Sequence, residues 1–208
     1  MRDMYRGFLD APLSAKLGLV TITAYLFVAL FAPVVAPYSE TEILGGAYVL
    51  WSEKCPLGTD NLGRDMLSRL IFGARNTIGI ALAAVVIAFA IGGVTGMLSA
   101  ILGGWYDTII SRIVDILMAI PGLVFALLIL TVLGTTITTL VLVIAVLDST
   151  RVYRITRAAA MNVAVMDFVE VARLRGEGLW WVIRKEILPN IMAPLLAEFG
   201  LRFCFVFL

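Results

Sequence analysis

Five apolar runs dominate this sequence, and most of them are long enough to cross a bilayer. They cover residues 17–36, 77–102, 109–133, 137–147 with an extension toward 153, and 188–208. A transmembrane helix needs about 20 predominantly apolar residues, and a helix satisfies its own backbone hydrogen bonds in lipid. The sequence therefore predicts an all-α, polytopic transmembrane helical bundle with five spans. The last run ends as FCFVFL without a polar flank, so we expect a further C-terminal span that this chain lacks.

Composition narrows the class of protein further. The chain is 61% hydrophobic and 15% charged, so we expect the bilayer to be its solvent. Sixteen Lys and Arg against fifteen Asp and Glu argue against a nucleic-acid partner, which needs a basic excess. The absence of histidine excludes His-based catalytic triads and His metal ligands. Cys55 and Cys204 are far apart and are interpreted as ordinary thiols.

The distribution of Lys and Arg predicts the orientation. Eleven of these residues fall in the N-terminal tail, the short loop at Arg112 and the segment 151–187, and four fall in the loop 37–76. Because cytoplasmic loops carry the basic excess, we expect a cytoplasmic tail at 1–16, a first span at 17–36 and a periplasmic loop at 37–76. A transmembrane domain at 77–208 then follows, with a cytoplasmic segment at 151–187.

The predicted periplasmic loop ends in an amphipathic helix. Residues 56–63 form a cluster of turn and cap residues, and apolar residues then recur at helical spacing up to Arg75. This pattern indicates a helix at the membrane interface that leads into the second span.

Small residues form a stripe along the second span. Their spacing of four places them on one helix face, where another helix backbone can approach closely. The stripe is either a packing surface or a surface on which a neighbour slides during a conformational cycle. Its members are Ala84, Ala88, Gly92, Gly96 and Ala100.

Three residues are candidates for lining a translocation path. Pro121, followed by glycine, interrupts the third run as a packing kink or as a helix break that lines a cavity. Glu198 and Arg202 are four residues apart, which favours an ion pair that either lines the path or is structural. Asp148 is interpreted as a solvated end of the fourth span.

The segment 167–190 interrupts the apolar runs with charge. A short helix at 167–175, on which Phe168, Val171 and Ala172 are expected to share a face, stops at the glycines of Gly176-Glu177-Gly178. A second helix then leads to Leu188-Pro189, where proline suits the first turn of the last span. This helix–turn–helix either docks into a groove on a soluble partner or rests on headgroups with its two tryptophans as anchors.

The same segment resembles the cytoplasmic EAA signature of ABC importer permeases. Glu170-x-Ala172, Gly176 and Leu188-Pro189 stand at the spacing of that signature, with Val171 in place of the middle alanine. The stretches LGTDNLGRDMLSRLIFGAR and GGWYDTIISRIVDILMAIPGLVFALLIL are similar to the second, C-type permease subunit of the dipeptide/oligopeptide/nickel branch. Arg202 departs from the mostly apolar pattern of that family.

The resemblance implies a subunit of an ATP-driven importer in the bacterial inner (plasma) membrane. Its partners would be a homologous second permease subunit, two cytoplasmic ABC ATPase subunits and an extracytoplasmic solute-binding protein. ATP and Mg would be bound by the ATPases, and this chain, which has no G-x-x-x-x-G-K-[ST] loop, would carry no cofactor and no enzyme activity. The solute would be a peptide, nickel, glutathione or an opine-like compound. The residues implied in ATPase coupling are Glu170, Val171, Ala172, Arg173, Gly176, Leu188 and Pro189.

Two other functions stay open on the residues alone. An ion-coupled secondary transporter needs ionisable groups within the membrane, for which Glu198 is the candidate. A truncated or non-transporting membrane protein is also compatible with the bare hydrophobic end of the sequence.

Overall fold

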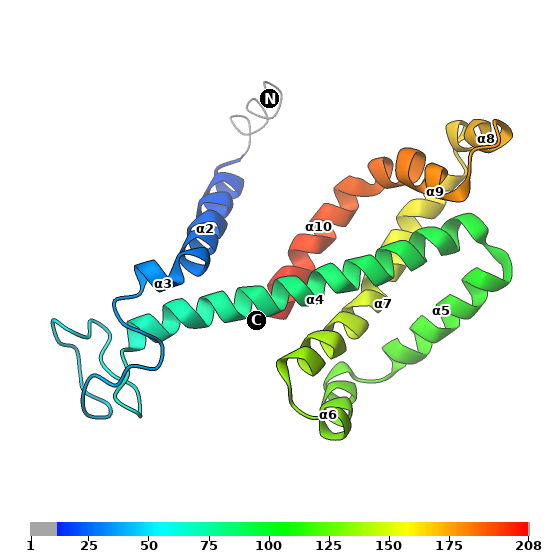
Figure 1. The fold of residues 1–208 in the computed structure, drawn as a ribbon. Helices are drawn as coiled ribbons and strands as arrows, with labels where there is room; N and C mark the ends of the chain where they lie inside the picture. The colour runs from blue at the N-terminus through cyan, green and yellow to red at the C-terminus, as the bar shows by residue number, and fades with distance from the viewer. Residues whose placement is uncertain (1–11, 208) are drawn as a thin grey trace. The chain divides into compact units, whose positions relative to one another are not determined.

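The computed structural model describes residues 12–207, and within this range the fold is all-α, as predicted (Figure 1). Outside the helices, two isolated β-bridges pair Ile43 with Arg64 and Thr59 with Asp65. The predicted tail at 1–16 falls mostly outside the described residues, as does Leu208 at the end of the predicted fifth span. The helices in chain order are α2 (Leu13–Leu30), α3 (Ala32–Val35), α4 (Met66–Leu102), α5 (Gly104–Ala119), α6 (Gly122–Leu133), α7 (Ile137–Ala164), α8 (Asp167–Leu174), α9 (Leu179–Val182), the π-helical turn η1 (Ile183–Ile187) and α10 (Leu188–Phe207).

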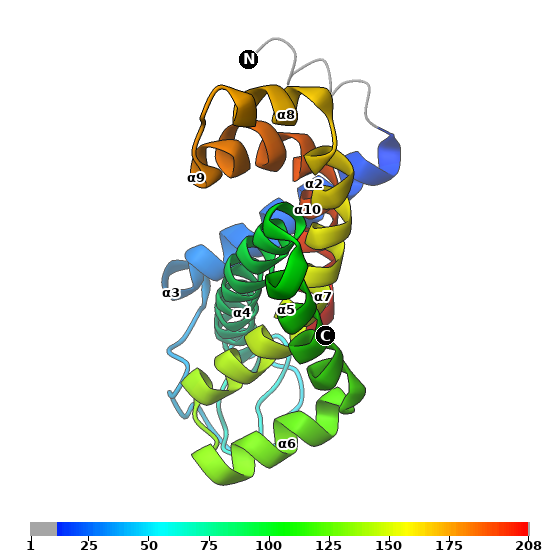
Figure 2. The same cartoon turned by 90° about the vertical axis from the view of Figure 1, so that its right-hand side faces the viewer.

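The chain divides into two compact units, Met1–Gly79 and Ile80–Leu208. In the described part of the first unit, α2 and α3 are followed by an irregular loop, which leads into the beginning of α4. The second unit holds the rest of α4 and all later helices. In this unit, α8 and α9 lie at one end and α6 at the other, and α7 runs between these ends (Figures 1 and 2).

The predicted count of five spans is not matched. Among the described residues, three helices are long and apolar enough to cross a membrane, namely α2, α4 and the continuous helix Leu179–Phe207. The bent pair α5–α6 makes a fourth if it is counted as one span. The predicted fourth run lies on α7, which is long enough but carries Asp148, Arg151 and Arg154 in its first 18 residues. Charge at this density is costly in hydrocarbon, so α7 does not qualify by composition.

Two predicted element boundaries are absent from the structure. The interfacial helix and the second span form one helix, α4, of 37 residues. At 1.5 Å per residue it is about 55 Å long, well beyond the hydrocarbon core. The second helix of the charged segment likewise continues without interruption into the last span as α9, η1 and α10.

The main hydrophobic cluster of the second unit lies where α8, α9 and η1 meet the C-terminal parts of α4 and α7. Val169 and Ala172 of α8 are buried there against the helix that begins at Leu179. This cluster anchors the short charged helix to the bundle. Its buried members are Met97, Ala160, Val169, Ala172, Val182, Ile183, Ile187, Ile191 and Leu195.

Candidate coupling element and translocation cavity

Helix α8 is a single short helix with a well-formed C-terminal cap. Gly176 has φ +81°, a left-handed conformation that glycine adopts at little steric cost. Its N–H donates to the carbonyl of Arg173 (2.9 Å), and the N–H of Glu177 donates to the carbonyl of Ala172 (3.2 Å). These two bonds constitute a Schellman motif, which satisfies carbonyls at the helix end. The predicted stop at Gly176 therefore has a defined geometry.

The buried face of α8 differs from the predicted one. Val169 is fully buried and Ala172 is 3% exposed, whereas Phe168 and Val171 are 42% and 43% exposed. The spacing of three between Val169 and Ala172 selects this face, which packs on η1 and α9. The face predicted from Phe168 and Val171 is therefore wrong, because packing in one cluster with Val182 and Ile187 buries Val169 instead.

The residues implied in coupling divide into an exposed and a buried group. Glu170, Val171 and Arg173 are exposed on α8, and Ala172 faces the core. Leu188 is half-buried and Pro189 is exposed at the beginning of α10. Helix α8 and the beginning of α10, which carry these residues, lie at one end of the second unit (Figure 2).

Pro189 lies inside a continuous helix and not at the start of a separate one. Proline has no N–H and clashes with the carbonyl four residues earlier, so an uninterrupted α-helix accommodates it poorly. The π-helical turn η1, Ile183–Ile187, ends two residues before it and includes the residue four positions earlier. A wider turn at this point relaxes the backbone that faces the proline ring.

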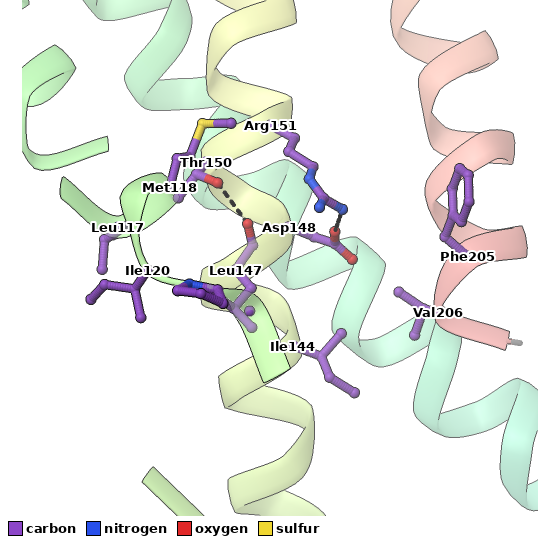
Figure 3. Close-up of a pocket in the computed structure, with 12 residues that line it drawn as sticks. Leu117, Met118, Ile120, Ile144, Leu147, Asp148, Thr150, Arg151, Phe205 and Val206 are labelled. Atoms are coloured by element: carbon purple, nitrogen blue, oxygen red, sulfur yellow. Dashed lines mark hydrogen bonds and ion pairs between the residues drawn. The ribbon is translucent and has the colours of Figure 1, made fainter. Parts of the chain in front are cut away.

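A cavity of about 490 Å³ opens at the break between α5 and α6 (Figure 3). The two helices meet at 90°, and Ile120 and Pro121 have extended backbone between them. Pro121 and Gly122 line the cavity together with Asp148 and Arg151 of α7 and Phe205 of α10. The predicted interruption at Pro121 is therefore a helix break beside a cavity.

Glu198 and Arg202 form the predicted ion pair, and it belongs to a larger network. Nε of Arg202 donates to Oε1 of Glu198, and Nη1 of Arg202 lies 3.7 Å from Oδ1 of Asp148. Arg151 approaches the same Oδ1 to 3.6 Å. Asp148 is only 7% exposed, so its interpretation as a solvated helix end is wrong. Glu198 and Arg202 do not line the cavity themselves but hold one of its lining residues.

The stripe of small residues lies partly against α7. A side-chain carbon at Gly92 would clash with the carbonyl oxygen of Ser149 and lie 2.9 Å from the N atom of Tyr153. At Gly96 it would lie 2.9 Å from the carbonyl oxygen of Tyr153. Ala84 and Ala88 are fully buried and Ala100 is half-buried. Close helix approach thus occurs at the two glycines.

A polar network that the sequence did not reveal joins α4, α5 and α7. The hydroxyl of Tyr153 lies 3.1 Å from Oγ of Ser99 and 2.9 Å from Oγ of Ser111. The guanidinium of Arg157 forms a bidentate pair with the carboxylate of Asp107. The only available signal was the spacing of three among Arg151, Arg154 and Arg157, which does not identify partners on another helix.

The loop of the first unit is organised by the carboxylate of Asp60. Its Oδ1 accepts from the backbone N–H groups of Leu62 (2.8 Å) and Arg64 (3.0 Å). Its Oδ2 accepts from the side chains of Arg64 (2.9 Å) and Arg69 (2.6 Å). Burial raises the pKa of Asp60, but these hydrogen bonds outweigh it and hold the pKa well below its usual range.

The fold and these sites define a class, that of polytopic helical membrane proteins with a broken helix beside a charged cavity. The family described as binding-protein-dependent transport system inner membrane component matches residues 92–208. That match covers more than half of the chain, and the chain belongs to this family.

Curated relatives agree with the resemblance to C-type permeases of the dipeptide branch. The chain is 36% identical over 191 residues to the dipeptide transport system permease protein DppC of Haemophilus influenzae, covering 88% of the chain and 65% of that relative. It is 38% identical to the di/tripeptide transport system permease protein DppC of Pseudomonas aeruginosa, covering 89% and 64%. It is 27% identical to the glutathione transport system permease protein GsiD of Pectobacterium atrosepticum, covering 97% and 67%. The chain spans just under two thirds of the length of the DppC relatives.

Proposed function

We propose that this chain is a permease subunit of an ATP-driven ABC importer and forms part of the translocation path for a small solute. Family membership and the names of the relatives support import, and those names favour peptides and glutathione over nickel or opine-like compounds. The partners in this proposal are a second permease subunit, two cytoplasmic ATPases that bind ATP and Mg, and an extracytoplasmic solute-binding protein.

The division of α8 into a buried and an exposed face carries the coupling part of the proposal. Val169 and Ala172 are buried and fix the helix to the bundle, while Glu170 and Arg173 are exposed. A helix fixed on one side transmits a push on its other side to the helices beneath it. Since η1 and α10 continue from this contact without a break, movement of α8 would reach the membrane spans. This part of the chain would lie in the cytoplasm, as the basic residues of 151–187 favour.

Two substitutions test coupling in the complete importer, reconstituted in proteoliposomes with ATP supplied to the ATPases. Glu170→Arg reverses a charge on the exposed face, and Gly176→Pro removes the N–H that donates to Arg173. Both should abolish ATP-dependent uptake of dialanine while membrane insertion is retained. If uptake survives both changes, the coupling proposal is wrong.

The chain offers a matched control for each variant. Gly178 has φ −72°, which suits proline, and its N–H makes no backbone hydrogen bond among the described residues. Gly178→Pro should therefore retain uptake. Glu40→Arg reverses the charge of an exposed glutamate in the loop of the first unit and should do the same.

Topology has an independent test. A cysteine at position 177, in a chain with Cys55 and Cys204 replaced, should resist an impermeant thiol reagent added outside intact cells. It should react once the cells are opened. Labelling from outside would place α8 on the wrong face of the membrane for contact with ATPases.

A further inference from the structure

We propose that the cavity beside Pro121 is a binding site for a small zwitterion, in which Asp148 receives an ammonium group and Arg151 receives a carboxylate. This proposal rests on the proposed function, because it assigns a solute class to the translocation path. Figure 3 shows both side chains extending from α7 toward the side of Phe205 and Val206, and the end of α5, which also lines the cavity, lies on the other side of α7.

The first support is that Asp148 makes only long ion pairs with its neighbours. Seven ion pairs join described residues, and the two that involve Asp148 are the longest, at 3.6 Å to Arg151 and 3.7 Å to Arg202. The Arg154–Asp115 pair, by comparison, is 2.6 Å. A hydrogen bond between charged groups is normally shorter than about 3 Å. The buried carboxylate of Asp148 thus keeps acceptor capacity that no described side chain fills at hydrogen-bonding distance.

The second support is the charge balance around the cavity. Two arginines, Arg151 and Arg202, face two carboxylates, those of Asp148 and Glu198. Arg202 is engaged by Glu198, so it holds Asp148 in place without saturating it. Since this group is neutral, a solute with one net charge would leave an uncompensated charge beside the buried carboxylate of Asp148, which is costly. A zwitterion would separate the Arg151–Asp148 pair. Its ammonium group would then pair with Asp148 and its carboxylate with Arg151, so that every charge keeps a partner.

The third support is the unwound backbone at Ile120 and Pro121. A helix end leaves carbonyls without an intrahelical partner, and such groups are tolerated at membrane depth where they line a water-filled cavity or are buried in protein. The end of α5 opens into this cavity, as discontinuous helices do at the binding sites of some transporters.

The remaining walls limit the size and character of the solute. Apolar side chains surround the charged pair, and the volume of about 490 Å³ suits a small molecule. The chemistry therefore favours a zwitterion with short apolar side groups, such as an unmodified dipeptide of small residues. The apolar lining includes Leu117, Met118, Ile120, Leu147, Phe205 and Val206.

A cysteine-protection experiment tests the site in the assembled importer without its solute-binding protein. Met118→Cys places a thiol in the cavity lining, with Cys55 and Cys204 changed to serine, and its rate of modification by N-ethylmaleimide is measured. Dialanine should slow this reaction at concentrations about tenfold lower than N-acetyl-dialanine or dialanine amide, each of which lacks one charge. Equal protection by all three compounds, or protection by none, would overturn the proposal.

Two variants test which residue binds the ammonium group of the solute and which binds its carboxylate. Asp148→Asn should weaken protection by dialanine about tenfold and remove its advantage over the N-acetyl form. Arg151→Gln should weaken protection by dialanine about tenfold and remove the advantage of dialanine over dialanine amide. The Arg151 side chain is 56% exposed, so this variant should assemble even if Asp148→Asn does not. Unchanged selectivity in Arg151→Gln would itself contradict the site.

The Arg154–Asp115 ion pair, which joins α7 to α5 outside this cavity, is the matched control. Asp115→Asn and Arg154→Gln remove charges of the same kind and should leave protection unchanged. ATP-dependent uptake by the importer that retains Met118, with its solute-binding protein restored, is measured in parallel. Absence of uptake in this complex counts against the proposed function, whereas uptake in this complex together with unselective protection of the Met118→Cys thiol counts against the zwitterion site alone.

Discussion

The hydroxyl of Tyr153 on α7 donates a hydrogen bond to Oγ of Ser99 on α4 over 3.1 Å, and both residues are buried. Tyr153→Phe should leave Ser99 without this partner and lower stability by about 1–3 kcal/mol, the cost of a buried polar group left unsatisfied. Thermal unfolding of the purified complex in detergent measures this. Tyr106→Phe is the control, because no hydrogen bond to the Tyr106 hydroxyl is present among the described residues. Equal unfolding temperatures for the two variants would contradict a stabilising role for the network.

Adjacent glycines of α4 should respond in opposite ways to the same substitution. Gly92→Ala introduces a methyl group against the backbone of Ser149 and Tyr153, so α4 and α7 must separate, at a cost of about 1–3 kcal/mol. Gly93 has nothing within 4 Å of the corresponding position, and alanine is the better helix former by up to about 1 kcal/mol. Gly93→Ala should therefore be neutral or stabilising. The two unfolding temperatures, measured side by side, decide this, and a shift of the same sign and size in both would rule out the packing argument.

The fold class was predictable because it depends on properties that short segments carry by themselves. The length and apolarity of residues 77–102 identify a helix in lipid, and Pro121 marks a break, since proline removes a backbone donor. Gly176 marks a helix end because few other residues adopt positive φ. Each of these inferences needs only local backbone physics.

Partner choice between helices was not predictable in the same way. The burial of Asp148 depends on Arg202, which lies 54 residues later on another helix, and the sequence offers no register between α7 and α10. The burial of Val169 instead of Phe168 likewise depends on where η1 lies. A boundary was also predicted where the structure has none, because the interfacial helix and the second span are one helix. No proline or cap interrupts residues 73–79, so α4 continues where polarity alone suggested a boundary.

The Schellman motif at the end of α8 gives a purely conformational prediction. Gly176 has φ +81° with open space around it, so Gly176→Ala meets no clash and pays only the cost of a left-handed backbone, about 1–2 kcal/mol. Gly178 also has open space, but its φ of −72° suits alanine. Gly176→Ala should therefore increase hydrogen exchange, corrected for intrinsic rates, at the amides of positions 176 and 177, and Gly178→Ala should not. Equal exchange at these amides in both variants would show that the turn does not depend on glycine.

The hydrogen bonds to Asp60 predict a pH dependence in the loop of the first unit. Because the folded pKa of Asp60 is lowered from 3.8, its ionised form stabilises the loop at every pH above that value. The contribution is lost as the pH falls below 3.8 toward the folded pKa. Protection of the Leu62 and Arg64 amides, corrected for intrinsic exchange rates, should thus be constant between about pH 5 and 7 and decline in acid.

In Asp60→Asn, protection of these amides should be several-fold lower at neutral pH and should lose its acid decline. Glu53→Gln, which neutralises an exposed carboxylate of the same loop, should keep the original profile. An unchanged profile in Asp60→Asn would show that another group organises the turn.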